Sequence, residues 1–304
     1  MRILILGGTR FVGRAIVDHA VSQGHSVTVL TRGSTTLPEV ENLVADRNDG
    51  LTELGGREWD ATVDVCAYRP GQVRTAAQAL GERAGVYTLI STVSVYSDAI
   101  PVNATESAPL VDTAAVVDDP DRVEMSAQTY GPLKVLCEQL AHESFAHPLI
   151  IRPTYVIGPR DYTARFPAWV QRIAENLTVD CPGPADAAMQ YVDARDQAAF
   201  VVGLLERGVR GTFHCAAPPT TFAEMLTGIA QALEVSPEMN WLDAASCQGR
   251  ESEFPLWASG ESTPMLHLDP TAALEAGLCI RPFADTVRDT RHWQLLQGAT
   301  SEAR

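Results

Sequence analysis

The sequence lacks the features of several protein classes. Asp and Glu outnumber Lys and Arg by 38 to 23 in its 304 residues, which gives a net charge of −15. Binding to the phosphates of nucleic acids needs clustered cations, so this balance argues against nucleic acid as a general partner. No apolar run approaches the roughly 18 residues of a membrane span, and the apolar start is shorter than the region of about 7–15 residues in a secretory signal. We therefore expect a cytoplasmic protein with no membrane partner.

Cysteine and histidine do not occur at metal-binding spacings. None of the six cysteines belongs to a CxxC pair, so we interpret them as reduced thiols and not as a zinc framework. His142 and His147 are five positions apart, whereas a zinc-binding helix of the HExxH type needs two histidines on one face, four apart. The sequence predicts no metal site.

Apolar runs alternate with helical patterns along the first half of the chain. Residues 3–6 form a continuous apolar run, typical of a strand buried on both faces. A glycine turn at 7–9 then leads into apolar residues at helical spacing, and a second β-branched run follows at 26–30. Further strands are expected at 61–65, 86–91 and 149–152, and further helices at 73–80 and 130–145. This order predicts an α/β fold with a doubly wound parallel sheet.

The composition changes after Gly158-Pro159, where Trp and Pro become more frequent. We interpret residues 1–157 as mainly a dinucleotide-binding domain and residues 158–304 as a smaller α/β substrate lobe, from which some segments return to the first core. Residues 97–126 are acidic and irregular. For this stretch we favour a solvated loop over a substrate lid.

The turn between the first strand and the first helix fits a pyrophosphate group. Gly7 allows the tight turn, and Gly13 lets the helix pack close to the sheet. The start of the helix offers free N–H groups and a partial positive charge to a phosphate. Arg10 replaces the usual middle glycine, and a cation there is a candidate phosphate ligand. The predicted contacts of this turn are Gly7, Thr9, Arg10, Phe11, Val12 and Gly13.

The residue after the second strand distinguishes NAD from NADP. An acid at this place binds the ribose hydroxyls of NAD, whereas an arginine pairs with the 2′-phosphate of NADP. The chain has Arg32 there, which together with Arg10 favours NADP over the alternative, NAD. Asp46 and Arg47 follow the third strand, where a carboxylate can bind the adenine amino group; a surface turn is the alternative interpretation.

Tyr130 and Lys134 are spaced to share one face of a helix. A tyrosine hydroxyl ordinarily has a pKa of about 10, and a fixed ammonium group that stabilises the phenolate makes it a usable acid–base group. Upstream, the Ser/Thr-rich segment 90–96 leaves the end of a strand, and a hydroxyl there can align a substrate oxygen with the tyrosine. The pair gains specificity because it follows both this segment and the phosphate turn.

These segments together resemble the extended short-chain dehydrogenase/reductases of the NAD-dependent epimerase/dehydratase type. The matching segments are GGTRFVG at 7–13, ISTVSVY at 90–96, YGPLK at 130–134, IRPTYVIGPRD at 151–161 and QYVDARD at 190–196. The GGTRF start and residues 162–172 also look like a branch that includes the chloroplast stem-loop-binding proteins. The resemblance implies a Rossmann fold with a bound nicotinamide cofactor.

The resemblance also implies roles for single residues. Tyr130 would be the acid–base residue, Lys134 its electrostatic partner, and Thr92 the hydroxyl that holds the substrate oxygen. The implied cofactor contacts, besides Tyr130 and Lys134 themselves, are Cys66, Ala67, Tyr68 and Pro153. The implied substrate contacts are Ser94, Arg160, Tyr162, Arg165 and Gln190.

Two departures from the family pattern narrow the chemistry. Sugar 4,6-dehydratases have Asp-Glu directly after the catalytic threonine, whereas this chain has Val93 and Ser94, so dehydration is not expected. Nucleotide-sugar enzymes usually have an arginine where this chain has Gln190, which argues against a nucleotide-sugar substrate.

We therefore expect an NADPH-linked reductase of a ketone, or the reverse oxidation of a secondary alcohol, with Thr92, Tyr130 and Lys134 as its triad. An NAD-dependent epimerase of a sugar or nucleoside-like substrate is the first alternative. A non-catalytic RNA-binding protein on the same scaffold is the second, against which the negative charge and the retained triad argue. Many relatives pair through a two-helix face, so a homodimer is a further expectation.

Overall fold

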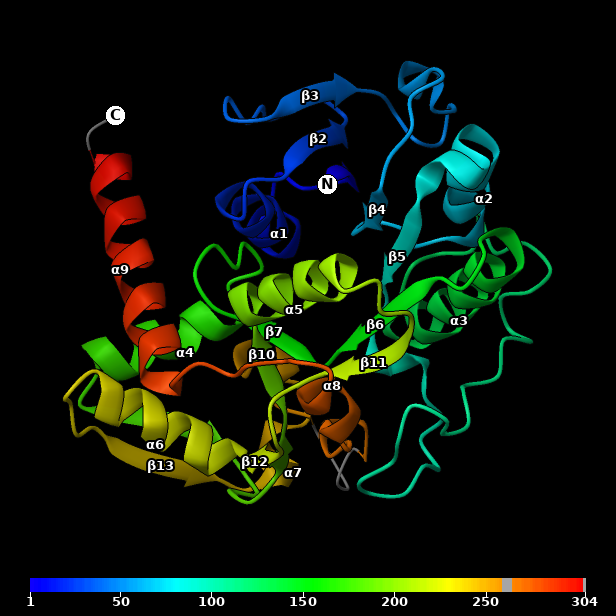
Figure 1. Ribbon diagram of the computed structural model, residues 1–304. Coiled ribbons are helices and arrows are strands. Elements are labelled where there is room, and N and C mark those ends of the chain that lie inside the picture. Colours follow the sequence, from blue (N-terminus) through cyan, green and yellow to red (C-terminus); the bar gives the residue numbers. More distant parts are fainter. Residues whose placement is uncertain (259–263, 303–304) are drawn as a thin grey trace.

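The computed structural model describes residues 1–258 and 264–302, and its centre is a parallel sheet of seven strands (Figure 1). The strand order is β11-β6-β5-β4-β1-β2-β3, and each neighbouring pair is parallel. The strands are β1 (Arg2–Leu6), β2 (Ser26–Thr31), β3 (Glu41–Val44), β4 (Ala61–Asp64), β5 (Val86–Ile90), β6 (Leu149–Pro153) and β11 (Gly211–Cys215). The predicted doubly wound Rossmann sheet is confirmed.

Helices cover both faces of this sheet, so its central strands are largely apolar and buried. On one face lie α1 (Phe11–Ser22) and α5 (Ala194–Glu206), and on the other lie α2 (Pro70–Leu80) and α3 (Ala127–Ser144) (Figure 1). Successive residues of β1 belong to opposite cores: Ile3 and Ile5 pack beneath α1 and α5, while Leu4 and Leu6 pack beneath α2 and α3. β1 thus joins two separate hydrophobic cores.

The remaining elements form a second lobe with its own core. Its main helices are α4 (Arg165–Glu175), α6 (Phe222–Ala232) and α9 (Phe283–Glu302), and α4 and α6 bury Trp169 and Phe222 against each other. Its other elements are β7 (Tyr155–Ile157), β8 (Thr178–Pro182), β9 (Ala188–Met189), β10 (Tyr191–Asp193), β12 (Thr220–Thr221), β13 (Glu238–Leu242) and α7 (Ala244–Cys247). The short helix α8 (Thr271–Glu275) instead packs on β11 and buries Ala273 in the core of the main sheet. Short 3₁₀ helices occur at Thr52–Leu54, Gly81–Ala84, Val93–Val95, Glu251–Glu253 and Pro264–Leu266.

The chain passes between the two lobes more than once. α5 and β11 follow residue 157 in the sequence, yet α5 packs on α1 and β11 pairs with β6 at the edge of the main sheet. We keep the division near residue 157 as a proposal for where the substrate lobe begins. In the described part of the chain, every helix is too short or too polar to cross a membrane, and the compartment stays a prediction.

The acidic segment 97–126 is more than a solvated loop. It contains no helix or strand, and two isolated bridges link it to other parts of the chain, one between Tyr96 and Leu110 and one between Ala104 and Leu268. Most of its side chains are exposed, as expected, but its last part is attached to α2. The Asp121 carboxylate accepts a 2.7 Å hydrogen bond from the backbone N–H of Gly71, where α2 begins. The solvated-loop interpretation therefore holds for only part of the segment.

Candidate functional site

A cavity of about 750 Å³ lies at the carboxyl ends of the central strands. This is the edge at which parallel α/β sheets bind their ligands, because the loops that follow neighbouring strands diverge there. Its volume falls within the range of about 300–1,000 Å³ that is usual for small-molecule and cofactor sites. Its wall includes residues 7–13 after β1, Arg32 after β2, Asp46 after β3, Cys66 after β4, Thr92 after β5 and Pro153 at the end of β6.

The turn after β1 depends on its glycines. Gly7 and Gly8 have φ angles of +100° and +103°, a conformation that side chains with a Cβ rarely adopt. A Cβ on Gly13 would lie 2.7 Å from the Cα atom of Gly8, so only glycine lets α1 start this close to the turn. The first turn of α1 contains no acidic residue, and Arg10 makes no side-chain capping bond there. The N–H groups at this helix start therefore stay available to an anion.

Lys134 is held on the wall of the same cavity by backbone groups. It is only 2% exposed. Its ammonium group donates hydrogen bonds of 2.7 Å to the carbonyl oxygen of Ala67 and 2.8 Å to that of Ile90. Ala67 is a predicted cofactor contact, but its side chain is buried in the core and it lies outside the cavity lining. Its carbonyl group contributes to the site by holding Lys134. The positive charge is thus fixed between the turns that follow β4 and β5.

Tyr130 and Thr92 reach the cavity from two adjoining elements. Tyr130 lies in the first turns of α3, whose start is capped by reciprocal bonds between Ser126 and Thr129. Thr92 caps the 3₁₀ turn after β5, where its Oγ accepts a 3.1 Å hydrogen bond from the N–H of Ser94. Thr92, Ser94, Tyr130 and Lys134 all line the cavity. The structure therefore brings the predicted triad and Ser94 to one wall.

Gly131 is a requirement of the site that sequence reasoning missed. A Cβ at this position would lie 2.1 Å from the carbonyl oxygen of Ser94. Only glycine therefore lets α3 approach the end of β5 so closely that Tyr130 and Thr92 share a wall. The available signal was the position of this glycine, directly after the tyrosine of the YGPLK segment.

A buried chain of polar groups supports this wall from behind. Ser91, next to Thr92, donates a 2.5 Å hydrogen bond to Glu138. Glu138 also receives two bonds from Arg152, of 3.0 and 2.6 Å. Arg152 in turn donates to the Tyr96 hydroxyl at 2.7 Å. Glu138 lies one helical turn after Lys134 on α3, so the same chain of contacts holds α3 and the end of β5 together.

The last residue of this series of polar contacts is His214 on β11. Its Nε2 atom lies 2.5 Å from the Tyr96 hydroxyl, and its Nδ1 atom lies 2.9 Å from the carbonyl oxygen of Asp269. Burial lowers the pKa of His214, although the nearby Glu106 carboxylate acts in the opposite direction. Burial also raises the pKa of Tyr96 to about 12. Both groups are therefore uncharged at neutral pH.

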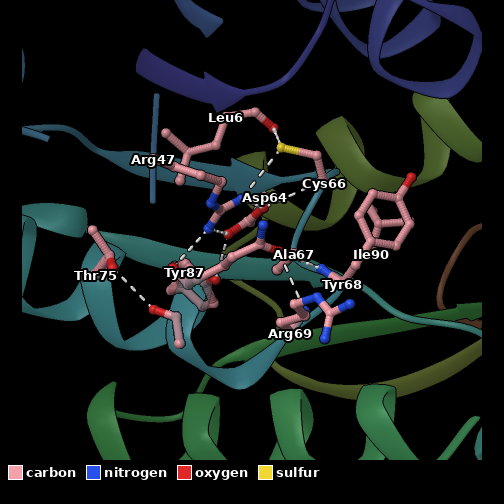
Figure 2. A network of polar contacts seen from close by, with 12 residues as sticks. Leu6, Arg47, Asp64, Cys66, Ala67, Tyr68, Arg69, Thr75, Tyr87 and Ile90 are labelled. Carbon is pink, nitrogen blue, oxygen red and sulfur yellow. Dashed lines mark hydrogen bonds and ion pairs between the residues drawn. The ribbon is translucent and has the colours of Figure 1, made fainter. Parts of the chain in front are cut away.

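A second network of polar contacts joins Arg47, Asp64 and Tyr87 next to the cavity, whose lining includes Arg47 and Cys66 (Figure 2). Arg47 binds Asp64 through both terminal nitrogens, at 2.7 and 2.6 Å, and Tyr87 donates to the same carboxylate at 2.8 Å. Burial alone would raise the pKa of Asp64, but the charge and hydrogen bonds of Arg47 outweigh it and lower the pKa. Burial raises the pKa of the neighbouring Cys66 thiol.

This second network holds Arg47, which is one of the predicted cofactor contacts. Arg47 lines the cavity, and its guanidinium group binds Asp64 and the carbonyl oxygen of Gln72. Arg47 therefore supports the wall, and its direct contact with a cofactor stays a prediction. The carboxylate of Asp46 lines the cavity and accepts bonds from the backbone and side-chain nitrogens of Asn48, both at 2.9 Å. Asp46 therefore forms part of a turn, as one interpretation predicted, and also lines the cavity, as the other required.

Two predicted substrate residues lie outside the cavity lining. Arg160 pairs with Asp18 on α1 at 2.6 Å, because the loop after β7 turns toward that helix. Gln190 is fully buried, and its amide bonds to the carbonyl oxygens of Ala217 and Leu268. Both side chains connect segments of the fold, which corrects their assignment as substrate contacts. The other predicted residues that line the cavity are Thr9, Arg10, Phe11, Val12, Arg32, Cys66, Tyr68, Pro153, Tyr162 and Arg165.

Three cations on the cavity wall have no acidic partner. Within residues 1–258 and 264–302, no carboxylate lies at salt-bridge distance from Arg10, Arg32 or Arg165. In a chain with a net charge of −15, such unpaired cations in one cavity indicate an anionic ligand.

Sequence reasoning also missed several residues of the wall. Thr154 and Tyr155 follow Pro153, and Met265 and Leu266 come from the last third of the chain. The position of Thr154 directly after a predicted cofactor contact was a usable signal. Nothing in the local sequence of Met265 and Leu266 indicates that the chain returns to the cavity there.

The comparisons with known proteins agree with this geometry. A model of the NAD-dependent epimerase/dehydratase family matches residues 3–87 and 73–216. The chloroplast stem-loop binding protein of 41 kDa b of Arabidopsis thaliana is 24% identical over 236 residues, covering 70% of this chain and 58% of that protein. Eugenol synthase 2 of Clarkia breweri is 27% identical over 174 residues, covering 53% of this chain and 55% of that enzyme. The chain thus matches a little over half the length of each of these two relatives.

Solved structures share the fold over nearly the whole chain. The UDP-glucose 4-epimerase of Thermus thermophilus, solved in complex with NAD, superposes with a TM-score of 0.70 and 17% sequence identity. The alignment covers 96% of this chain and 98% of the epimerase. At this identity the likeness supports the fold, and the chemistry has to be argued from the residues described above.

Proposed function

Because the chain belongs to the NAD-dependent epimerase/dehydratase family, we propose that it is an NAD(P)-dependent oxidoreductase of the extended short-chain type. The observation that carries this proposal is the shared cavity: Thr92, Tyr130 and Lys134 line the same space as the phosphate turn after β1. A protein that used the scaffold only for binding would not need this combination of groups.

The residues of the cavity fit a dinucleotide. The open helix start at α1 and the unpaired Arg10 suit a pyrophosphate. Arg32 lies after β2 with Ser34 beside it on the wall, where the two side chains suit a 2′-phosphate. These groups support NADPH as the preferred cofactor, with NAD as the alternative. Near the other end, Lys134 and Pro153 are placed for the nicotinamide riboside.

The reaction that this wall supports is the reduction of a ketone to a secondary alcohol. When bound, the nicotinamide supplies a hydride to the carbonyl carbon. Tyr130 donates its hydroxyl proton to the carbonyl oxygen, and the hydroxyl of Thr92 holds that oxygen in place. The resulting phenolate lies near the fixed ammonium group of Lys134, which stabilises it. One hydride on carbon and one proton on oxygen complete the alcohol, and the reverse steps oxidise it.

An epimerase is the main alternative, because the same groups can oxidise an alcohol and return the hydride to the opposite face of the ketone. The two activities differ in what happens to the nucleotide: an epimerase regenerates it and can keep it bound, whereas a reductase must exchange it. The Thermus structure with NAD is an epimerase, so this alternative needs a direct test.

The test is to denature the purified protein and to identify any released nucleotide by mass spectrometry. A reductase is expected to release little nucleotide, and the emptied protein should then prefer NADPH in a titration. Stoichiometric release of NAD⁺ would support the epimerase and contradict the role of Arg32. A protein that binds neither nucleotide would contradict both activities and favour the binding role that the name of the Arabidopsis relative raises.

A further inference from the structure

Aromatic rings surround the reactive end of the cavity. Tyr68 and Tyr162 line it together with Tyr130, and these two side chains are 44% and 58% exposed. The pKa of Tyr68 is raised to about 12, first by partial burial and then by the nearby hydroxyls of Tyr162 and Tyr130. The three phenols therefore lie close together. Large aromatic side chains left open inside a cavity are a surface on which a planar ligand can stack.

Other residues of the cavity lining are also suited to a flat, apolar ring. Tyr155, Val156, Met265 and Leu266 have largely apolar side chains. Methionine adapts its shape to a neighbouring ring and makes favourable contacts with aromatic groups.

Arg165 supplies a cation at this end. Its guanidinium carbon lies 5.7 Å from the centre of the Tyr155 ring, and its Nε atom donates to the hydroxyl of Thr163. Its terminal nitrogens are free of any acidic side chain among the residues that the structure describes. A second guanidinium, that of Arg10, lies 5.3 Å from the centre of the Tyr162 ring, and we assign it to the pyrophosphate. Arg165 is the unpaired arginine that this assignment leaves for the substrate, and a guanidinium group pairs with a carboxylate through two parallel hydrogen bonds.

We propose that the substrate is a planar aromatic ketone, or the matching secondary alcohol, that carries one carboxylate group. The ring stacks on Tyr162 and Tyr68, and the carboxylate pairs with Arg165. This inference rests on the proposed function. In the reductive direction, the ketone gains a hydride from NADPH and a proton from Tyr130, which leaves NADP⁺ and the alcohol.

The proposal is tested with the NADP⁺-loaded protein and four probes. Calorimetry would compare 4-acetylbenzoate with acetophenone, which lacks the carboxylate, with 4-acetylcyclohexane-1-carboxylate, which lacks the flat ring, and with UDP. We expect 4-acetylbenzoate to bind at least about tenfold more tightly than each of the other three, since one charge-assisted contact or one stacked ring contributes roughly that factor. Oxidation of NADPH, followed by absorbance, would show whether 4-acetylbenzoate is also reduced.

Matched variants identify the contacts. Arg165→Gln should remove the preference for 4-acetylbenzoate over acetophenone and leave acetophenone binding unchanged. Tyr162→Ala should remove the preference for the flat ring, and Tyr162→Phe should retain it. Arg288→Gln, which changes an exposed arginine of α9 paired only with Asp285, is the control and should bind all probes as the unaltered protein does.

The outcomes separate this inference from the function on which it rests. Normal NADP⁺ binding with UDP as the tightest probe, or with equal binding of flat and saturated rings, would overturn the substrate class and leave the oxidoreductase standing. An Arg165→Gln variant with an unchanged carboxylate preference would also overturn the proposal. Failure of the protein to bind any nicotinamide nucleotide would overturn both.

Discussion

The ammonium group of Lys134 donates a 2.7 Å hydrogen bond to the carbonyl oxygen of Ala67, which ties α3 directly to the turn after β4. A second bond, to the carbonyl oxygen of Ile90, ties the same group to the end of β5. One side chain therefore fixes the helix that carries Tyr130 against the two strand ends that form the wall. Because both acceptors are backbone groups, this arrangement depends on the path of the chain more than on which residues follow the strands.

The first prediction concerns the acid–base role of Tyr130. Tyr130→Phe removes the only proton that this side chain can donate, so turnover should fall by at least about 10²-fold, the usual contribution of general acid catalysis. Cofactor affinity should stay within a few-fold, since the ring remains in place. Steady-state kinetics and a nucleotide titration measure the two effects. Tyr191→Phe, on β10 and outside the cavity lining, is the control; near-normal turnover of the Tyr130 variant would contradict the mechanism.

The second prediction concerns the choice of nucleotide. Arg32→Ala removes the cation proposed for the 2′-phosphate, so NADPH binding should weaken by about tenfold or more while NADH binding changes little. Fluorescence titration with both nucleotides gives the ratio. Arg160→Ala provides a matched comparison, because Arg160 pairs with Asp18 outside the cavity lining and should leave both affinities unchanged. An equal effect of Arg32→Ala on the two nucleotides would remove the case for a phosphate site there.

The third prediction concerns the buried ion pair between Arg47 and Asp64. Asp64→Asn leaves the Arg47 charge buried without a counter-ion, which should lower the free energy of unfolding by about 3–5 kcal/mol. Asp60→Asn breaks the exposed pair with Arg2, so its cost should be about 0–1 kcal/mol. Urea unfolding of both variants at neutral pH makes the comparison. Similar losses for the two would mean that the Arg47–Asp64 pair is not the support that its burial indicates.

The fourth prediction follows from the lowered pKa of His214. The unfolded chain binds a proton at this residue below pH of about 6.5, whereas the folded protein, with its lower pKa, does not do so until the pH falls further. The free energy of unfolding should therefore decrease as the pH falls below about 6.5, by at most about 1.4 kcal/mol per pH unit from this group.

His214→Gln should make that decrease shallower. Urea unfolding at pH values between about 8 and 5 gives the slope for each protein. The pKa of His19 is also lowered by burial, so part of the slope should persist in the variant, and His19→Gln measures that part. Equal slopes for His214→Gln and the unaltered protein would show that His214 does not contribute.

Much of the fold follows from local patterns in the sequence. The uninterrupted apolar strands and the helical spacing after the first glycine turn are sufficient for a doubly wound sheet, because such strands must be covered on both faces. The edges of elements were less predictable: α3 starts at Ala127, before the expected Tyr130, because the bonds between Ser126 and Thr129 cap it there. The partial attachment of segment 97–126 to α2 depends on Asp121, whose partner lies fifty positions away.

Some residues of the candidate site could be predicted from the sequence and others could not. Residues that follow strand ends, such as Arg32 and Thr92, could be placed from the sequence because parallel strands bring their carboxyl ends to one edge. Arg47 and Gln190 could not, since their roles depend on distant partners: Asp64 in one case, and Ala217 and Leu268 in the other. The buried contacts from Ser91 to His214 escaped prediction for the same reason, because they join α3, β6 and β11 to the segment that follows β5.

The most direct test of the oxidoreductase proposal is a calorimetric titration of the nucleotide-free protein with NADPH and then with NADH. The account predicts saturable binding of one NADPH per chain, with weaker binding of NADH, because the phosphate turn and Arg32 contact the same molecule. Absence of heat and of saturation with both nucleotides would contradict it, because the cavity that joins Thr92, Tyr130 and Lys134 to the phosphate turn would then have no nicotinamide to act on.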